Sequence, residues 1–162
     1  MITKLKFQDE IQAPSGELYV KYSGKEPFKA MAMTPKMLRD VMKIPGKDLF
    51  ELDVRWDISQ DPRGFYGVWM GKRTEDRWTH TKIRIIVQGE QKTADKTGMV
   101  EIRIRGHLVT EYNFSNFIQR SFWWFYNFGF YYKQRRQYLE FAKDNMQEIK
   151  ERYLRELQIL RE

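Results

Sequence analysis

The sequence predicts an α+β domain, a twisted antiparallel β-meander with one short helix, covered by a single long C-terminal helix. Two observations favour this fold class. Apolar and polar residues alternate with a period of two in several segments before residue 112, and helical spacing runs from about residue 115 to the end. With 162 residues, 41% of them hydrophobic and 31% charged, the chain is long enough to bury the core of one domain.

Six segments are expected to be extended. Residues 3–11 and 17–23 flank a turn signal, Ala-Pro-Ser-Gly, at 13–16. Four later segments alternate apolar and polar residues, namely 49–58, 64–73, 77–88 and 99–112. Short connections, such as residues 74–76, favour hairpins and hence antiparallel pairing. The polar stretch 89–98 is expected to form a longer loop.

One face of this sheet is expected to be wet and to carry charges of both signs. Segment 49–58 should place its acids on that face and its apolar side chains on the other, these being Phe50, Leu52, Val54, Trp56 and Ile58. The acids are then expected to lie across from bases in 82–84 or 103–105, as a lattice of salt bridges. An RNA-binding surface is the alternative, which the net charge of +7 favours. Its candidate residues are Lys82, Arg84, Arg103, Arg105, Arg135 and Arg136.

A short helix is expected before this meander. Thr34 suits the N-cap position and Pro35 the first helical position, while Pro45 and Gly46 end the helix.

The long helix begins with the most aromatic segment of the chain. Twelve of the 25 aromatic residues lie between 112 and 132, and those in 122–132 point all round the helix. Because monomers seldom expose an apolar patch above a few hundred Å², such a helix needs neighbours on more than one side. One face is expected to cover the sheet. The other is expected to meet the short helix, a ligand, a partner protein or a second copy of the chain; a membrane surface is not favoured.

The last part of the helix changes character, because its apolar residues recur in a narrow stripe typical of a coiled-coil seam. A straight helix of about 45 residues would be roughly 65–70 Å long, which exceeds a domain of this size. We therefore expect a domain over 1–142, with 143–162 projecting, packing on a partner or returning along its own domain. The expected partner-contact residues are Trp123, Tyr126, Phe130, Met146, Ile149 and Tyr153.

The sequence argues against several kinds of chemistry. It has no cysteine and only two histidines, His80 and His107, both expected on the wet face. It contains no Walker loop, no GxGxxG fingerprint and no HExxH motif. We therefore expect no cofactor, no metal site and no catalytic residue. Neither a signal peptide nor a membrane-spanning segment is expected, which favours the cytoplasm.

Four segments carry a resemblance to a known family: ELYVKYSG (17–24), TPKMLRDVMKIP (34–45), FELDVRWDI (50–58) and the helix from Asn116. Their order, over residues 17 to about 142, resembles the START-like helix-grip superfamily, which includes lipid-transfer proteins and polyketide-cyclase relatives. The resemblance implies a cavity for an apolar small molecule between the sheet and the final helix. Candidate cavity residues are Trp56, Trp69, Met70, Phe122 and Phe125. The chain departs from the superfamily in having room for one clear helix in 24–48 and about 20 residues beyond the usual end.

These observations favour a non-catalytic protein that holds an apolar small molecule or a protein partner against its aromatic helix. A basic RNA- or ribosome-associated factor is the alternative, and a cyclase- or hydrolase-like enzyme of the helix-grip class is the second alternative.

Overall fold

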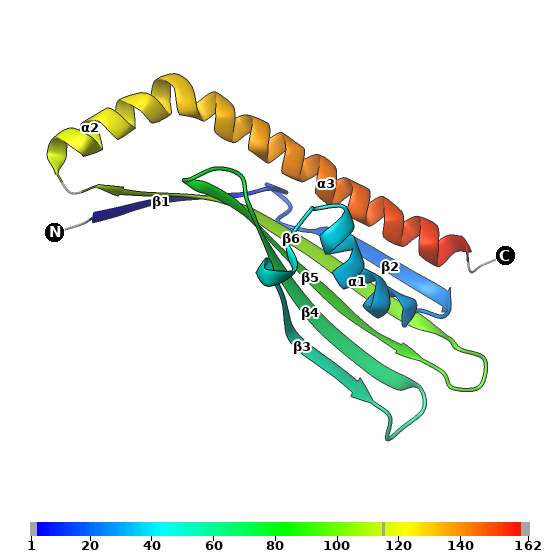
Figure 1. Ribbon diagram of the computed structural model, residues 1–162. Helices are drawn as coiled ribbons and strands as arrows, with labels where there is room; N and C mark the ends of the chain where they lie inside the picture. The colour runs from blue at the N-terminus through cyan, green and yellow to red at the C-terminus, as the bar shows by residue number, and fades with distance from the viewer. Residues whose placement is uncertain (1–2, 115, 160–162) are drawn as a thin grey trace.

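The computed structural model describes residues 3–114 and 116–159 and confirms the α+β class (Figure 1). The strands are β1 (Thr3–Glu10), β2 (Leu18–Lys25), β3 (Leu49–Asp57), β4 (Arg63–Thr74), β5 (Thr79–Gln91) and β6 (Thr97–Phe114). The helical segments are α1 (Lys29–Asp40), the 3₁₀ turn η1 (Gly46–Asp48), α2 (Phe117–Tyr126), the π-helical turn η2 (Asn127–Tyr131) and α3 (Tyr132–Ile159). The helices lie on one face of the sheet, and we call the other face the outer face.

The sheet is antiparallel, with the order β1-β6-β5-β4-β3, and β2 also pairs with β6. β1 and β2 follow one another along the same edge of β6, because β1 pairs with residues 107–114 and β2 with residues 97–104. β5 pairs with β6 only as far as Thr79 opposite Thr110. In the described sheet, residues 111–114 of β6 have β1 as their partner strand, and on the other side the Glu111 amide N–H donates to the Trp78 carbonyl, just before β5, at 2.8 Å. The sheet narrows to two strands at this end.

The core lies between α3, α1 and the helix face of the sheet. From α3, the side chains of Met146, Ile149, Tyr153 and Leu157 are fully buried against this core. Each fully buried side chain of this size stabilises the fold by roughly 1.5–3 kcal/mol. Residues 143–159 thus pack along their own sheet and do not project from it.

One continuous helical stretch bends at η2, which contains Gly129 (Figure 1). A π-helical turn interrupts the regular hydrogen-bond ladder, and such turns commonly bend helices. The bend lets α2 lie over the two-stranded end of the sheet while α3 crosses its wider part. Asn116 caps the start of α2, because the Gln119 amide N–H donates to Asn116 Oδ1 at 2.8 Å.

The short helix begins earlier than expected. α1 starts at Lys29, and its first turn is formed by the amides of Lys29 and Ala30, which donate to the carbonyls of Glu26 and Pro27. Thr34 therefore lies inside the helix, where its hydroxyl donates to the Ala30 carbonyl at 2.8 Å. Pro27 marks the start of this helix in the sequence, and Pro35 is a residue of its interior.

The expectation that five apolar residues of β3 share one face is wrong. The pairing register shifts between Glu51 and Asp53, where Leu52 forms a bulge. Residues directly opposite one another in an antiparallel pair point to the same face. Phe50, opposite Met70, therefore lies on the outer face, whereas Trp56, opposite the core residue Phe65, lies on the helix face. The unpaired Leu52 therefore reverses which residues of β3 point to the outer face and which to the helix face.

Candidate functional site

The aromatic residues of α2 and η2 divide into a buried set and an exposed set. Trp123 is 3% exposed and stacks between two rings of the sheet, Phe7 of β1 at 5.5 Å and Tyr112 of β6 at 5.0 Å between centroids. Its indole N–H has no hydrogen-bond partner among the described residues. Trp123 therefore attaches α2 to the two-stranded end of the sheet by apolar packing.

A hydrogen-bonded cluster attaches η2 to the turn between β4 and β5. The hydroxyls of Tyr131 and Tyr138 donate to Asp76 Oδ2 at 2.6 and 3.1 Å, and the amides of Trp78 and Thr79 donate to its Oδ1 at 2.7 and 2.8 Å. Partial burial alone would raise the pKa of Asp76, but these four hydrogen bonds together lower it below its ordinary value. Burial, with the Asp76 hydrogen bond, raises the pKa of Tyr131. The carboxylate form of Asp76 thus holds the bend in place.

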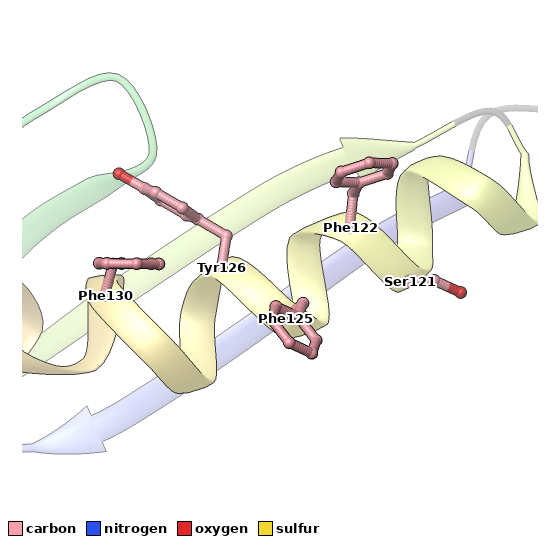
Figure 2. Close-up of a pocket in the computed structure, with 5 residues that line it drawn as sticks. All are labelled: Ser121, Phe122, Phe125, Tyr126 and Phe130. Carbon is pink, nitrogen blue, oxygen red and sulfur yellow. The ribbon is translucent and has the colours of Figure 1, made fainter.

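The exposed set forms an apolar surface on α2 and η2. Phe122, Phe125 and Phe130 are 72%, 80% and 71% exposed. Together with Ser121 and Tyr126 they line an open hollow of about 420 Å³ (Figure 2). At roughly 200 Å² for a whole aromatic side chain, the three phenylalanines alone expose on the order of 400 Å². A patch of that size is as large as the largest on a typical monomer, and such patches are often functional. We call Phe122, Phe125, Tyr126 and Phe130 the aromatic surface.

The charged residues that flank the aromatic surface along the chain are basic. Between Glu111 and Glu140 every charged residue in the sequence is basic, these being Arg120, Lys133, Arg135 and Arg136. Arg135 forms an ion pair with Asp9 of β1, and Arg136 one with Glu140 at 3.7 Å. The exposed Lys133 is the second residue of α3, close to the end of η2. An apolar surface with basic flanking residues suits a binding partner that is apolar at its centre and acidic around it.

The five expected cavity residues do not come together. Trp69 is buried in the core, Met70 lies on the outer face, and Trp56 lies half-exposed on β3. Phe122 and Phe125 lie on α2, over the opposite end of the sheet. The described space between α3 and the sheet is filled by core side chains, among them Met146, Ile149 and Tyr153.

The expected partner-contact residues are divided as well. Trp123 is buried under α2, and Met146, Ile149 and Tyr153 belong to the chain's own core. Tyr126 and Phe130 lie on the aromatic surface, next to Phe122 and Phe125, which the sequence had suggested for a cavity. Helical spacing groups these residues, but only the position of the sheet edge shows which side of α2 is covered.

The outer face carries salt bridges, as expected, but between other residues than expected: Lys4 and Lys6 pair with Glu111, and Lys21 pairs with Glu101. Lys82, Arg84, Arg103 and Arg105 all lie on it, with Arg84 directly opposite Arg105 and Lys82 directly opposite Lys72. β3 pairs with β4 alone among the described strands, so its acids do not lie across from these bases. Among these four bases, Arg105 forms an ion pair, with Glu17 at 2.8 Å. Partial burial, followed by the charges of Lys72 and Lys82, lowers the pKa of His80 on the same face.

In the described ranges, no three histidine or carboxylate side chains gather in a way that would hold a metal ion. Every helix within 3–114 and 116–159 is too short or too polar to pass through a lipid bilayer.

No protein-family model matches the chain, and no curated protein is significantly similar to it. A solved structure that resembles it is a protein of unknown function from Staphylococcus aureus, with 9% sequence identity and a TM-score of 0.22. The alignment covers 86% of this chain and 96% of the other. A likeness with so low a score supports no argument about fold or function, so the candidate sites rest on their own geometry.

Proposed function

We propose that this chain is a protein-binding domain that docks an acidic partner protein on the aromatic surface of α2 and η2. The observation that carries the proposal is the exposure of Phe122, Phe125 and Phe130 around one hollow. Trp123 and the Asp76 cluster hold this helical segment from below, so the exposed rings are presented on a fixed support. Aromatic side chains at the centre of an interface contribute most of the binding energy in many complexes.

A protein partner suits the aromatic surface better than an apolar small molecule does. Small-molecule sites enclose about 70–90% of the ligand, whereas this hollow is an open depression on one helical segment. The helix-grip resemblance would place a lipid between the final helix and the sheet, and there the described core is already filled by Tyr153 and its neighbours. A side chain inserted by a partner needs only a shallow, apolar depression.

The charge around the surface favours a different chain over a second copy. A symmetric dimer through α2 would bring Lys133 of each copy into one interface, and the sequence holds no acid between residues 112 and 139. Like charges at an interface oppose association. A partner with apolar residues flanked by aspartate or glutamate would complement both the rings and the basic flanking residues.

A photo-crosslinking amino acid placed at Phe125 in cells tests this proposal. The matched control places it at Phe50, which is half-exposed on the outer face. We expect a discrete protein adduct from position 125 alone. The purified partner should then bind the Phe122→Ala/Phe125→Ala variant roughly 30-fold more weakly, corresponding to about 2 kcal/mol for a central aromatic residue. An adduct with this same chain, or binding only to anionic vesicles, would contradict the proposal.

The outer face supports nucleic-acid binding as a second candidate function, because two pairs of like charges lie directly opposite one another on it. Such pairs destabilise a sheet unless something compensates them, and a phosphate backbone would do so. We expect the Arg84→Gln/Arg105→Gln variant to bind single-stranded RNA more weakly and with a shallower salt dependence. Arg136→Gln on α3 is the control. RNA binding that does not change between these variants would exclude the outer face.

A further inference from the structure

A second hollow lies at the opposite end of the sheet from α2, where two hairpin turns meet the start of α1 (Figure 1). Its volume is about 270 Å³, close to the lower limit of roughly 300 Å³ for small-molecule sites. The lining combines two aromatic rings, three cations and two polar side chains, namely Phe28, Trp56, Arg63, Gln91, Lys92, Thr93 and Lys96. None of these described lining residues is acidic. The hollow therefore suits a small anion.

Trp56 provides a flat aromatic platform in this hollow. One face of its ring stacks on Phe28, with centroids 4.4 Å apart and an angle of 23° between the planes. Phe28 is held in turn by the edge-on contact of Phe65 at 5.3 Å. Trp56 nevertheless remains 50% exposed and lines the hollow, so part of its ring is available to a planar ligand. Stacking of a nucleobase on an aromatic side chain is worth about 1–3 kcal/mol.

The three cations of the hollow are not held in ion pairs, although Lys92 is near enough to Asp95 for its charge to help lower the pKa of that carboxyl. None of Arg63, Lys92 and Lys96 forms an ion pair with another described residue. The nearby carboxylates of Asp61 and Asp95 accept hydrogen bonds from the Thr93 and Thr97 amides, at 2.9 and 3.0 Å. Three converging cations attract a phosphate group, which accepts strong charge-assisted hydrogen bonds.

The turn that carries two of these cations is fixed on several sides. Thr93 holds it to Asp61, and the Lys96 carbonyl accepts the Glu26 amide N–H at 2.7 Å. Lys96 and Glu26 both have left-handed backbone, with φ of 58° and 50°. For residues other than glycine this conformation costs about 1–3 kcal/mol and is concentrated at binding sites. The expected long loop at 89–98 is in fact this short turn, Lys92 to Lys96, between β5 and β6.

One further group is ready to donate to a ligand. The Gln91 Oε1 accepts the Phe28 amide N–H at 3.1 Å, which fixes the side-chain amide against the start of α1. A glutamine amide also carries two N–H donors, which this bond leaves unused.

We infer that this hollow binds a small phosphorylated molecule with one planar ring system, of the nucleotide class. The ring stacks on Trp56, and the phosphate lies among Arg63, Lys92 and Lys96. The inference is independent of the proposed docking function, because the hollow shares no residue with the aromatic surface.

Isothermal titration calorimetry on the intact chain tests the inference with the four ribonucleoside monophosphates, adenosine and inorganic phosphate. We expect at least one monophosphate to bind about tenfold more tightly than adenosine or phosphate alone, because it makes both the stacking and the charge contacts. Trp56→Leu and Lys96→Gly should each weaken binding about tenfold. Glycine suits the φ of Lys96, so that variant removes the charge without straining the turn.

Two matched controls accompany these variants. Phe50→Leu alters the other half-exposed aromatic ring of β3, and Lys47→Gln removes an exposed charge in η1, outside the hollow. Neither should change the affinity.

Three results would overturn the inference. The first is no heat at about 1 mM ligand, a concentration at which even a binding free energy near −4 kcal/mol would be detected. The second is equal affinity for phosphate and monophosphate. The third is an affinity that neither Trp56→Leu nor Lys96→Gly changes. A single-stranded oligonucleotide separates the two sources of a nucleotide. Binding that needs Trp56 supports the inference, whereas oligonucleotide binding that needs only Arg84 and Arg105 assigns nucleic acid to the outer face and counts against it.

Discussion

The two parts of the C-terminal helical stretch use their apolar residues in opposite ways. In α3 a narrow stripe, from Ala142 to Leu157, is fully buried, and charged residues occupy the remaining sides. In α2 the apolar residues surround the helix, and Trp123 alone among its described side chains is buried. Two adjoining helices on one sheet thus differ in how much of their apolar surface they hide.

The surroundings of the two helices help to explain the difference. α3 packs on β2 and β6 and against α1, which together cover the whole stripe. α2 lies over residues 111–114 of β6, whose partner strand in the described sheet is β1. A two-stranded ribbon covers little more than one row of side chains, so the aromatic surface stays outside. The exposure follows from the position of α2 together with its composition, because α2 carries apolar side chains all round whereas α3 carries them in one stripe.

The largest expected effect comes from Trp123, the buried ring among the described side chains of α2. Trp123→Ala should lower the free energy of unfolding by about 4 kcal/mol, since it removes the ring stacked between Phe7 and Tyr112. Urea denaturation followed by circular dichroism measures this. The neighbouring Phe122→Ala is the matched control and should change stability by no more than about 0.5 kcal/mol. Equal losses of unfolding free energy for the two variants would contradict the division of the α2 aromatic residues into a buried and an exposed set.

A somewhat smaller loss is expected in the stripe of α3. Ile149→Ala should cost about 3 kcal/mol, because the cavity it leaves is enclosed by the core. Thermal or urea unfolding of the monomer gives the value. The loss should not depend on protein concentration, because Ile149 packs within its own chain. A concentration-dependent stability would instead indicate that α3 packs on a second copy.

Asp76 gives an intermediate effect with a distinct pH dependence. Asp76→Asn should lower stability by about 2 kcal/mol at neutral pH, because hydrogen bonds to a charged carboxylate are replaced by weaker ones. The folded pKa of Asp76 is lowered, so its contribution is fully present above the ordinary carboxyl value of about 4 and is lost as the pH falls through the folded pKa. The stability difference between the wild type and Asp76→Asn should therefore shrink below about pH 4. A difference that stays constant down to pH 2 would exclude this role.

The smallest effect on stability is expected for the most exposed ring. Phe125→Ala should change the free energy of unfolding by less than about 0.5 kcal/mol, since the side chain packs on little and alanine favours helix. Binding of an apolar fluorescent dye should decrease, because the patch becomes smaller. Phe50→Ala is a suitable control for dye binding, because it removes an exposed ring of β3 that lies outside the aromatic surface. A large loss of stability would mean that Phe125 is covered in the folded chain.

Much of this fold can be predicted from the sequence, because period-two alternation and the stripe of α3 depend on local spacing. The bulge at Leu52 could not be predicted, since an alternating pattern is the same with or without one extra residue in the partner register. The start of α1 was misplaced because Thr34 and Pro35 form a good local cap signal, and burial of Thr34 against Tyr153 overrides it. For α2, the sequence shows where the aromatic residues lie. Which of them are covered depends on where β5 begins beside β6, and the spacing within α2 does not show that. The basic hollow at Trp56 joins three distant segments and leaves no mark in any one of them.

The bulge at Leu52 also bears on how the free edge of the sheet behaves toward other molecules. β3 has a neighbour on one side only among the described strands, so its outer backbone groups offer a template on which a foreign strand could add. A bulge interrupts the even spacing of those groups and twists the strand, and the charges of Asp53, Arg55 and Asp57 follow it. The irregularity that confuses a sequence-based reading of β3 thus protects the molecule against edge-to-edge aggregation.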